Sequence, residues 1–199
     1  MKAFVVVLLM MVAQPLAAQS GEWVSLFDGQ SLTGWRTSEN PATFSVAEGA
    51  IVVYGDRAHL FYEGPVGNHH FKNFELKVTL KTTPGSNSGI FIHTDYQDTG
   101  WPAKGYEIQV NQTHTDWRKT GSVYAVQDVK EIFVKDNDWY TQHIIVQGNQ
   151  ITVKVNDQVI NQYTAPDKSR LQGGTVALQG HDPKSKVFYK EVLIKVLPD

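Results

Sequence analysis

Alternating apolar and polar residues dominate this chain. In the longest such run, Phe74, Leu76, Val78 and Leu80 alternate with four polar residues. A period of two is typical of a β-strand with one buried face and one face in water. Similar runs recur without an amphipathic helix pattern between them, at 90–93, 106–110, 143–147, 150–155, 174–179 and 187–197. The pattern predicts an all-β fold, a sandwich or jelly roll of two antiparallel sheets.

Short turn sequences support this fold and place some strands beside each other. Gly148-Asn149 is expected to join 143–147 to 150–155 in a hairpin, and Asn156-Asp157 to close a second hairpin onto 158–160. No linker or repeat divides the chain after its first residues, so residues 19–199 are expected to form one domain. The segment 94–104 is longer than a hairpin needs and is a candidate wall for a binding cleft.

The first residues resemble a secretory signal peptide. Lys2 precedes the apolar run 3–13, and Pro15 and the small-residue segment 16–19 follow it. We expect residues 1–18 to be removed and the chain to be exported, to the periplasm or outside the cell. The alternative is an uncleaved membrane anchor, but such a helix covers only about 16 Å of a roughly 30 Å hydrocarbon core. No later stretch approaches a spanning length, so no stable membrane insertion is expected.

Composition excludes several classes of function. The 199 residues contain no Cys, which rules out disulfides, thiolate metal sites and a Cys nucleophile. Eighteen Lys and Arg stand against twenty Asp and Glu without a basic run, which argues against a nucleic-acid partner. Nucleotide-binding loops, the G-x-S-x-G elbow and the H-E-x-x-H motif are also missing from the sequence. The oligomeric state stays open.

Alternation also sorts the candidate site residues. If Ile90, Ile92 and Ile108 point into the core, their neighbours point outward on what are expected to be adjacent strands. These neighbours are Phe91, His93, Asp95, Glu107 and Gln109. Carboxylates, an imidazole, an amide and an aromatic ring suit a sugar, whose hydroxyls form hydrogen bonds and whose C–H faces pack on rings. The alternative is an outer face in water.

Aromatic residues in the same stretch favour the sugar hypothesis. Trp101, Trp117 and Tyr124 lack the spacing of core residues, so we expect them to contact a substrate. Trp23, Trp35 and Trp139 are instead assigned to core or sheet-edge packing.

Metal binding has a weaker case. His69 and His70 cannot both point one way from a strand and are interpreted as solvated loop residues. A divalent metal ion stays possible by two routes. One uses His93, His114 and His181 with Glu107, and the other uses the carboxylates of Asp95, Asp98, Asp136 and Asp138.

Six segments, taken in order, resemble the 3-keto-disaccharide hydrolase family of the concanavalin A-like lectin/glucanase superfamily. They cover nearly all of the chain after the leader. These segments are Leu26-Phe27-Asp28-Gly29 with Leu32, Gly34 and Trp35, Asn73-Phe74-Glu75-Leu76, Asn87-Ser88-Gly89-Ile90-Phe91-Ile92, Gly105-Tyr106-Glu107-Ile108-Gln109, Thr120-Gly121-Ser122-Val123-Tyr124 and Leu178-Gln179-Gly180-His181.

This resemblance implies a jelly roll with a sugar-binding concave face and cleavage of the glycosidic bond of 3-keto-glycosides. The motifs carry over Glu107, Gln109 and His181, and they add Gln179 to the expected substrate-binding residues. Two positions depart from the family pattern. His93 stands where the family usually has Arg, and Tyr189-Lys190-Glu191-Val192 replaces its common "FRNI".

The expected chemistry follows from the keto group. Ordinary glycoside hydrolysis uses two carboxyl groups, and Glu107 has only Asp95 as a visible partner. A carbonyl at C3 acidifies the proton at C2, so one base, one acid and one enolate stabiliser suffice. Glu107 or His181 is expected to take this proton, and the other, or His93, to act as acid or carbonyl polariser. A metal ion is a further candidate stabiliser. A non-catalytic carbohydrate-binding module and a conventional glycosidase are the alternative functions.

Overall fold

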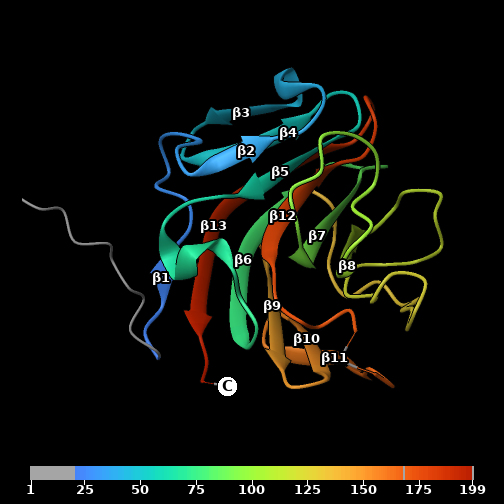
Figure 1. Cartoon of the computed structure of the whole chain (residues 1–199). Helices are drawn as coiled ribbons and strands as arrows, with labels where there is room; N and C mark the ends of the chain where they lie inside the picture. Colours follow the sequence, from blue (N-terminus) through green and yellow to red (C-terminus); the bar gives the residue numbers. More distant parts are fainter. Residues whose placement is uncertain (1–20, 168, 199) are drawn as a thin grey trace, which may run out of the picture.

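Two antiparallel sheets make up the protein, as predicted (Figure 1). The computed structural model describes residues 21–167 and 169–198. Within these ranges helical structure is limited to two 3₁₀ turns, η1 (Pro41–Thr43) and η2 (Val66–His69). None of the helices in this part of the chain is long and apolar enough to cross a bilayer. The expected leader lies outside the described residues, so the export prediction stays a prediction.

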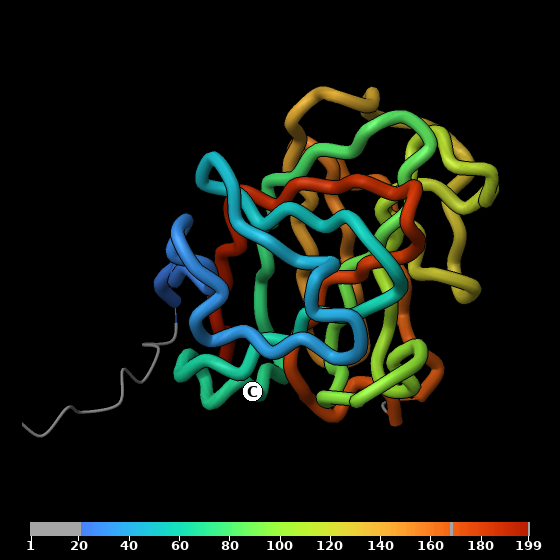
Figure 2. Tube along the Cα trace, turned by 90° about the horizontal axis from the view of Figure 1, so that it is seen from above, coloured from blue at the N-terminus to red at the C-terminus, as the bar shows by residue number. Residues whose placement is uncertain are grey.

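The larger sheet has eight strands and forms one layer of the sandwich. Its long strands β6 (Phe74–Thr82) and β13 (Lys186–Val196) pair over most of their length in the middle of the sheet. Figure 2 shows the red C-terminal segment beside segments from the first half of the chain. The order is β11 (Gln158–Thr164), β10 (Gln150–Val155), β9 (Tyr140–Gln147), β6 (Phe74–Thr82), β13 (Lys186–Val196), β4 (Ala50–Tyr54) and β3 (Phe44–Ala47), with β1 (Val24–Ser25) paired to β13.

Both hairpins expected from the turn sequences are present. Strand β9 joins β10 through Gly148-Asn149, and β10 joins β11 through Asn156-Asp157. Asn156 and Asp157 have φ of 46° and 66°, the left-handed conformation that short hairpin turns require.

The smaller sheet has five strands and positions the candidate site. Its order is β2 (Trp35–Thr37), β5 (Ala58–Tyr62), β12 (Thr175–Gly180), β7 (Asn87–Thr94) and β8 (Tyr106–Asn111). Its central strand β12 comes from near the C-terminus and is inserted between β5 and β7.

The core lies between the two sheets. Leu60, Ile90, Ile108 and Leu178 of the smaller sheet are buried there against the apolar face of the larger one. Strand β6 shows the predicted alternation along its whole length, because every second residue is buried. The residues between these core positions in the smaller sheet therefore occupy its other face.

Three tryptophans lie near the positions expected of them. The indole nitrogen of Trp35 donates a hydrogen bond to the Leu26 carbonyl oxygen (2.8 Å). Trp23 and Trp139 are more exposed than core residues, and the ammonium groups of Lys77 and Lys81 lie over their rings. Their packing is thus on the outer surface of the larger sheet.

Candidate active site

The outer face of the smaller sheet carries two neighbouring rows of side chains. Strand register aligns Phe61, Ala177, Phe91 and Glu107 across β5, β12, β7 and β8. The second row runs through His59, Gln179, position 89 and Gln109. Sequence alternation predicted this outward placement for Phe91, Glu107 and Gln109.

A cavity of about 500 Å³ opens over these rows, within the range of small-molecule sites. The loop 95–105 and the segment 112–129 supply walls beyond the sheet. Apolar and polar groups converge in it, as a sugar site requires. Its lining consists of Phe91, Trp101, Pro102, Gly105, Tyr124, Ala125 and Val126 together with Asn87, Glu107, Gln109, Arg170, Gln179 and His181.

Glu107 reaches across the sheet because position 89 is glycine. A Cβ on Gly89 would lie 2.3 Å from Glu107 Oε1 and 2.8 Å from its Cγ. In that space the carboxylate accepts a hydrogen bond from Gln179 Nε2 (2.9 Å). The Gln109 amide, oriented so that its nitrogen donates to the Ser88 carbonyl oxygen, also donates to Glu107 Oε1 (3.2 Å). Among the described residues, Oε2 has no hydrogen-bond partner.

The pKa of the Glu107 carboxyl group is raised toward neutral pH. Burial raises the pKa of its carboxyl group from 4.5 to about 7, opposed by the Gln179 hydrogen bond and aided by the negative charge of Asp116. A carboxylic acid with a pKa near the working pH can hold and transfer a proton efficiently.

This shift also affects stability, with a sign that can be tested. The folded state holds a proton that the unfolded state releases near its ordinary pKa of 4.5. Protonated Glu107 therefore contributes fully to the free energy of unfolding below pH 4.5. This contribution, roughly 3 kcal/mol, is lost as the pH rises through about 7. We expect Glu107→Gln to gain roughly 2–3 kcal/mol relative to wild type between pH 5 and pH 8, measured by urea unfolding. Parallel stability profiles of the two proteins would contradict the shift.

His181 enters the cavity just after β12 and is oriented by its neighbour. Its Nδ1 lies 2.7 Å from Asp182 Oδ2. Ser185 Oγ donates to the same carboxylate oxygen (2.8 Å), and the Lys184 backbone N–H donates to Oδ1 (2.8 Å). A carboxylate on Nδ1 assigns the ring proton to that nitrogen and leaves a lone pair on Nε2. His181 can therefore act as a base.

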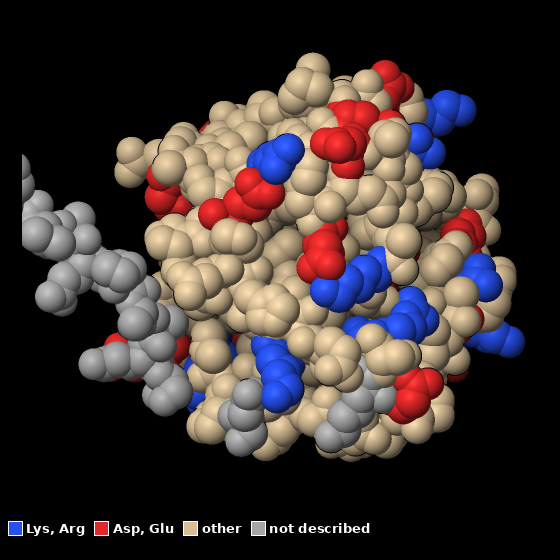
Figure 3. Space-filling view, viewed as in Figure 1, with Lys and Arg blue, Asp and Glu red and all other residues tan. Residues whose placement is uncertain are grey.

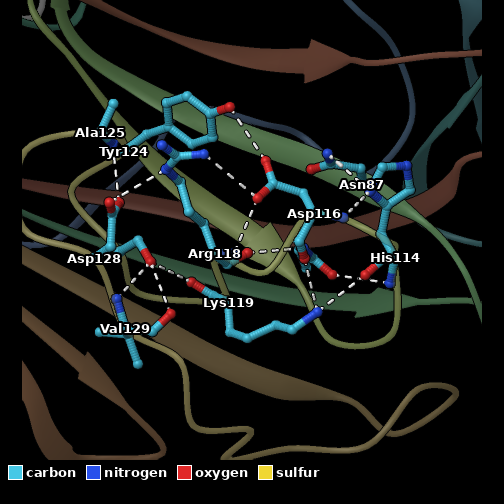
Figure 4. Close-up of polar contacts among 11 residues, drawn as sticks. Asn87, His114, Asp116, Arg118, Lys119, Tyr124, Ala125, Asp128 and Val129 are labelled. Carbon is cyan, nitrogen blue, oxygen red and sulfur yellow. Dashed lines mark hydrogen bonds and ion pairs between the residues drawn. The ribbon is translucent and has the colours of Figure 1, made fainter.

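The segment 112–129 is held beside β8 by a polar network (Figure 4). Tyr124 donates its hydroxyl to Asp116 Oδ2 (3.2 Å). Asp128 accepts hydrogen bonds from Arg118 Nε (3.2 Å) and the Ala125 backbone N–H (2.9 Å). The network fixes Tyr124 and Ala125 as part of the cavity wall.

The structure also brings together His114, His181 and Asp182, which could each offer a metal ligand within 4.8 Å of the others. His114 Nδ1, however, accepts the Asp116 backbone N–H (3.1 Å) and faces Asn87 Nδ2 (3.4 Å). Burial lowers the pKa of His114, so the ring is neutral and its proton lies on Nε2. This hydrogen-bond pattern leaves His114 no lone pair for a metal ion. The histidine set expected from the sequence does not assemble as predicted, because His93 is buried in the core.

The expectation that His93 faces the cavity is wrong. Its side chain is fully buried, its Nε2 lies 2.9 Å from the Lys72 carbonyl oxygen, and its ring packs against Phe74 of the larger sheet. The cause is a left-handed backbone (φ 53°) at His93, beside a register shift between β7 and β12. This irregularity breaks the alternation that the prediction assumed. His93 is therefore removed from the catalytic candidates.

Two predicted substrate contacts also lie outside the cavity lining. Asp95 is exposed and pairs with Lys104 Nζ (2.7 Å), since it follows the irregularity at His93. Trp117 is exposed at the surface, where the Arg118 guanidinium lies 4.8 Å from its ring centre. By contrast, Phe91, Trp101, Gln109, Tyr124 and Gln179 all line the cavity, as expected.

Sequence reasoning missed Asn87 and Arg170, which line the cavity, and Asp182, which orients His181. Asp182 could have been found, because it follows His181 directly in the chain. Arg170 carried no such signal, because it reaches the cavity from a loop and donates to the Gly105 carbonyl oxygen.

Charges on the face shown in Figure 3 are of both signs and interspersed. That face therefore presents no continuous cationic surface of the kind that binds nucleic acid.

Fold and site together define the class of protein: a concanavalin A-like jelly roll with a carboxyl group and an imidazole at a sugar-sized cavity. Solved structures show the same fold. A crystal structure of a protein from Parabacteroides distasonis ATCC 8503 has a TM-score of 0.74 at 21% identity, and the match covers 88% of this chain and 94% of that one. The structure of a non-specific endo-β-1,3(4)-glucanase has a TM-score of 0.59 at 13% identity, and the match covers 91% of this chain and 93% of that one.

The chain belongs to the family described as the 3-keto-alpha-glucoside-1,2-lyase-like domain, which matches residues 22–195. The resemblance noted in the sequence is thereby confirmed. A 3-keto-disaccharide hydrolase from Bacteroides thetaiotaomicron is 26% identical over 175 residues, covering 74% of this chain. The match spans 60% of that relative's own length.

Proposed function

We propose that this protein cleaves the glycosidic bond of 3-keto-glycosides by eliminating the aglycone. The observation that carries the proposal is the convergence of Glu107 and the Asp182-bound His181 on one cavity. Family membership supports the substrate class, because the family is described by its likeness to a 3-keto-alpha-glucoside lyase. The 3-keto group of such a substrate makes elimination possible with a single acid and a single base.

Each residue has a role in the proposed reaction. His181 Nε2 removes the C2 proton, which is acidic because the C3 carbonyl stabilises the resulting enolate. Electrons from the C2–H bond form the C1=C2 double bond, and the C1–O bond breaks. Glu107 in its protonated form gives its proton to the departing oxygen, so the products are an unsaturated keto sugar and an alcohol. The amide groups of Gln109 and Gln179 hold the carboxyl group in place.

A direct test compares a glucoside with its 3-keto derivative. Aglycone release from the keto sugar alone supports the proposal, and an unsaturated product identifies elimination. Release from both substrates would indicate a conventional glycosidase. Binding without release would indicate a carbohydrate-binding module.

Asp182 offers a test of how the base is oriented. In Asp182→Asn the amide can present its NH₂ group to His181 Nδ1, which moves the ring proton onto Nε2 and removes the base. We expect kcat on a 3-keto-glucoside to fall at least about tenfold with KM little changed. Ser185→Ala removes one hydrogen bond to the same carboxylate and one from the Asn87 backbone N–H, but leaves the carboxylate on His181. It is the matched control, and kcat should fall about threefold or less. An unchanged kcat in Asp182→Asn would exclude this role.

A further inference from the structure

His59 is a buried imidazole without hydrogen-bond partners. Its side chain is fully buried on β5, yet neither ring nitrogen has a partner among the described residues. A buried polar atom left unpaired costs about 1–3 kcal/mol. The proposed mechanism does not use His59, so this cost needs another explanation.

A second unpaired group lies beside it. Gln179 is directly opposite His59 in the β5–β12 register, and its Oε1 is also buried and unpaired. The Gln179 Nε2–H group already donates a hydrogen bond to Glu107 Oε1. Two adjacent strands thus present unsatisfied polar atoms on the face that carries the cavity.

Aromatic rings enclose His59 and separate it from the cavity. Its ring centre lies 5.2 Å from Phe91 and 5.6 Å from Trp101, both in edge-to-face geometry. Both aromatic residues line the cavity, whereas His59 does not. Trp101 is 46% exposed, and its indole nitrogen has no hydrogen bond within the described residues. The indole that covers His59 is therefore held by contacts of its ring, which include the Arg57 guanidinium (5.4 Å) and the His181 ring (5.5 Å).

The loop that carries Trp101 is fastened to the protein by hydrogen bonds that do not involve the indole ring. Glu39 accepts hydrogen bonds from Thr99 Oγ1 (2.7 Å) and the Gly100 backbone N–H (3.0 Å), and it also binds Arg57. Trp101 can change its side-chain conformation without breaking these contacts.

The chemistry of this place selects a neutral, hydroxyl-bearing ligand. Burial lowers the pKa of His59 to about 4, so the ring is neutral and offers one donor and one acceptor. Gln179 Oε1 adds an acceptor. A sugar hydroxyl matches this set, whereas a carboxylate or phosphate would need donors only.

We propose that His59 and Gln179 Oε1 form the polar floor of a second sugar subsite, covered by Trp101, which binds the ring next to the keto sugar. This inference rests on the proposed function and names the part of the site that holds a sugar aglycone. Strand β5 lies three strand spacings from β8, about 14 Å. Because Glu107 leans toward β12, the subsite begins about one sugar ring beyond the reacting bond.

The test compares a 3-keto-disaccharide with an aryl 3-keto-glucoside, whose aglycone has no hydroxyls. In His59→Leu we expect KM for the disaccharide to rise about tenfold, with kcat within about twofold, and KM for the aryl substrate to stay unchanged. His59→Gln, which keeps a donor and an acceptor, should retain KM within about threefold. His70→Leu, an exposed imidazole outside the cavity, is the matched control.

Calorimetry on the Glu107→Gln background measures disaccharide affinity while turnover is slow. The expected result is a Kd about tenfold weaker when His59→Leu is added. Tryptophan fluorescence should also change on disaccharide binding, and Trp101→Phe should remove that change. An unchanged Kd, or equal losses for both substrates, would overturn the subsite. Failure of the wild-type protein to cleave either keto-glycoside would instead contradict the proposed function.

Discussion

Replacing Glu107 by Gln is expected to lower kcat on a 3-keto-disaccharide by about a thousandfold, as loss of a general acid typically does. The variant keeps the shape of the side chain and its hydrogen bond from Gln179. It cannot give a proton to the departing sugar oxygen, which is a poor leaving group without one. On an aryl 3-keto-glucoside with a nitrophenolate leaving group, the loss should be about tenfold or less, because that group leaves as an anion. The measurement is steady-state kinetics on both substrates.

The difference between the two substrates is the informative result. A large loss on both would assign Glu107 to proton removal at C2 instead of protonation of the leaving group. Glu131→Gln, the same change at an exposed carboxylate, is the matched control and should behave as wild type. If Glu107→Gln retains disaccharide turnover within about tenfold, Glu107 is not the acid.

Replacing Gly89 by Ala should lower kcat/KM by about a hundredfold, because small misplacements of a catalytic group are costly. The added methyl group would lie 2.3 Å from Glu107 Oε1. The carboxylate must therefore leave its position, and it loses the hydrogen bond from Gln179. The backbone at Gly89 is not in the left-handed region, so alanine is tolerated there. Thermal unfolding should therefore change little while activity falls.

A double-mutant comparison separates displacement of Glu107 from general damage. Gln179→Ala removes the amide but leaves the space over Gly89 open, and we expect a loss of about tenfold. Combined with Gly89→Ala, it should add little, because both changes remove the same contact. Fully additive losses, or Gly89→Ala activity within about threefold of wild type, would show that Gly89 does not position Glu107.

Local patterns in the sequence predicted most of the fold. The alternation in 74–81 and the turn residues at 148–149 and 156–157 depend only on neighbouring residues, so they could be read directly. The placement of β12 between β5 and β7 could not, because it joins segments more than eighty residues apart in sequence. Nothing in the pattern of 175–180 specifies its neighbours.

The site was predictable only where the strands are regular. Glu107 and Gln109 lie on a strand without a bulge, and alternation placed both on the cavity face. His93 has a left-handed backbone that alternation does not reveal, and its ring turned out to be in the core. Asp182 and Arg170 lie in loops, where no periodicity constrains the direction of a side chain.

The central position of β12 makes the smaller sheet and its outer face depend on a strand that is synthesised long after β5 and β7. Gln179 lies on β12 and His181 directly follows it, and β5 and β7 have no shared neighbour until this strand is in place. A ribosome-bound or clipped chain that ends before residue 175 would hold Glu107 but neither the base nor the amide partner. The proposed reaction would therefore require β12 and the residues that follow it, however much of the rest of the chain is present.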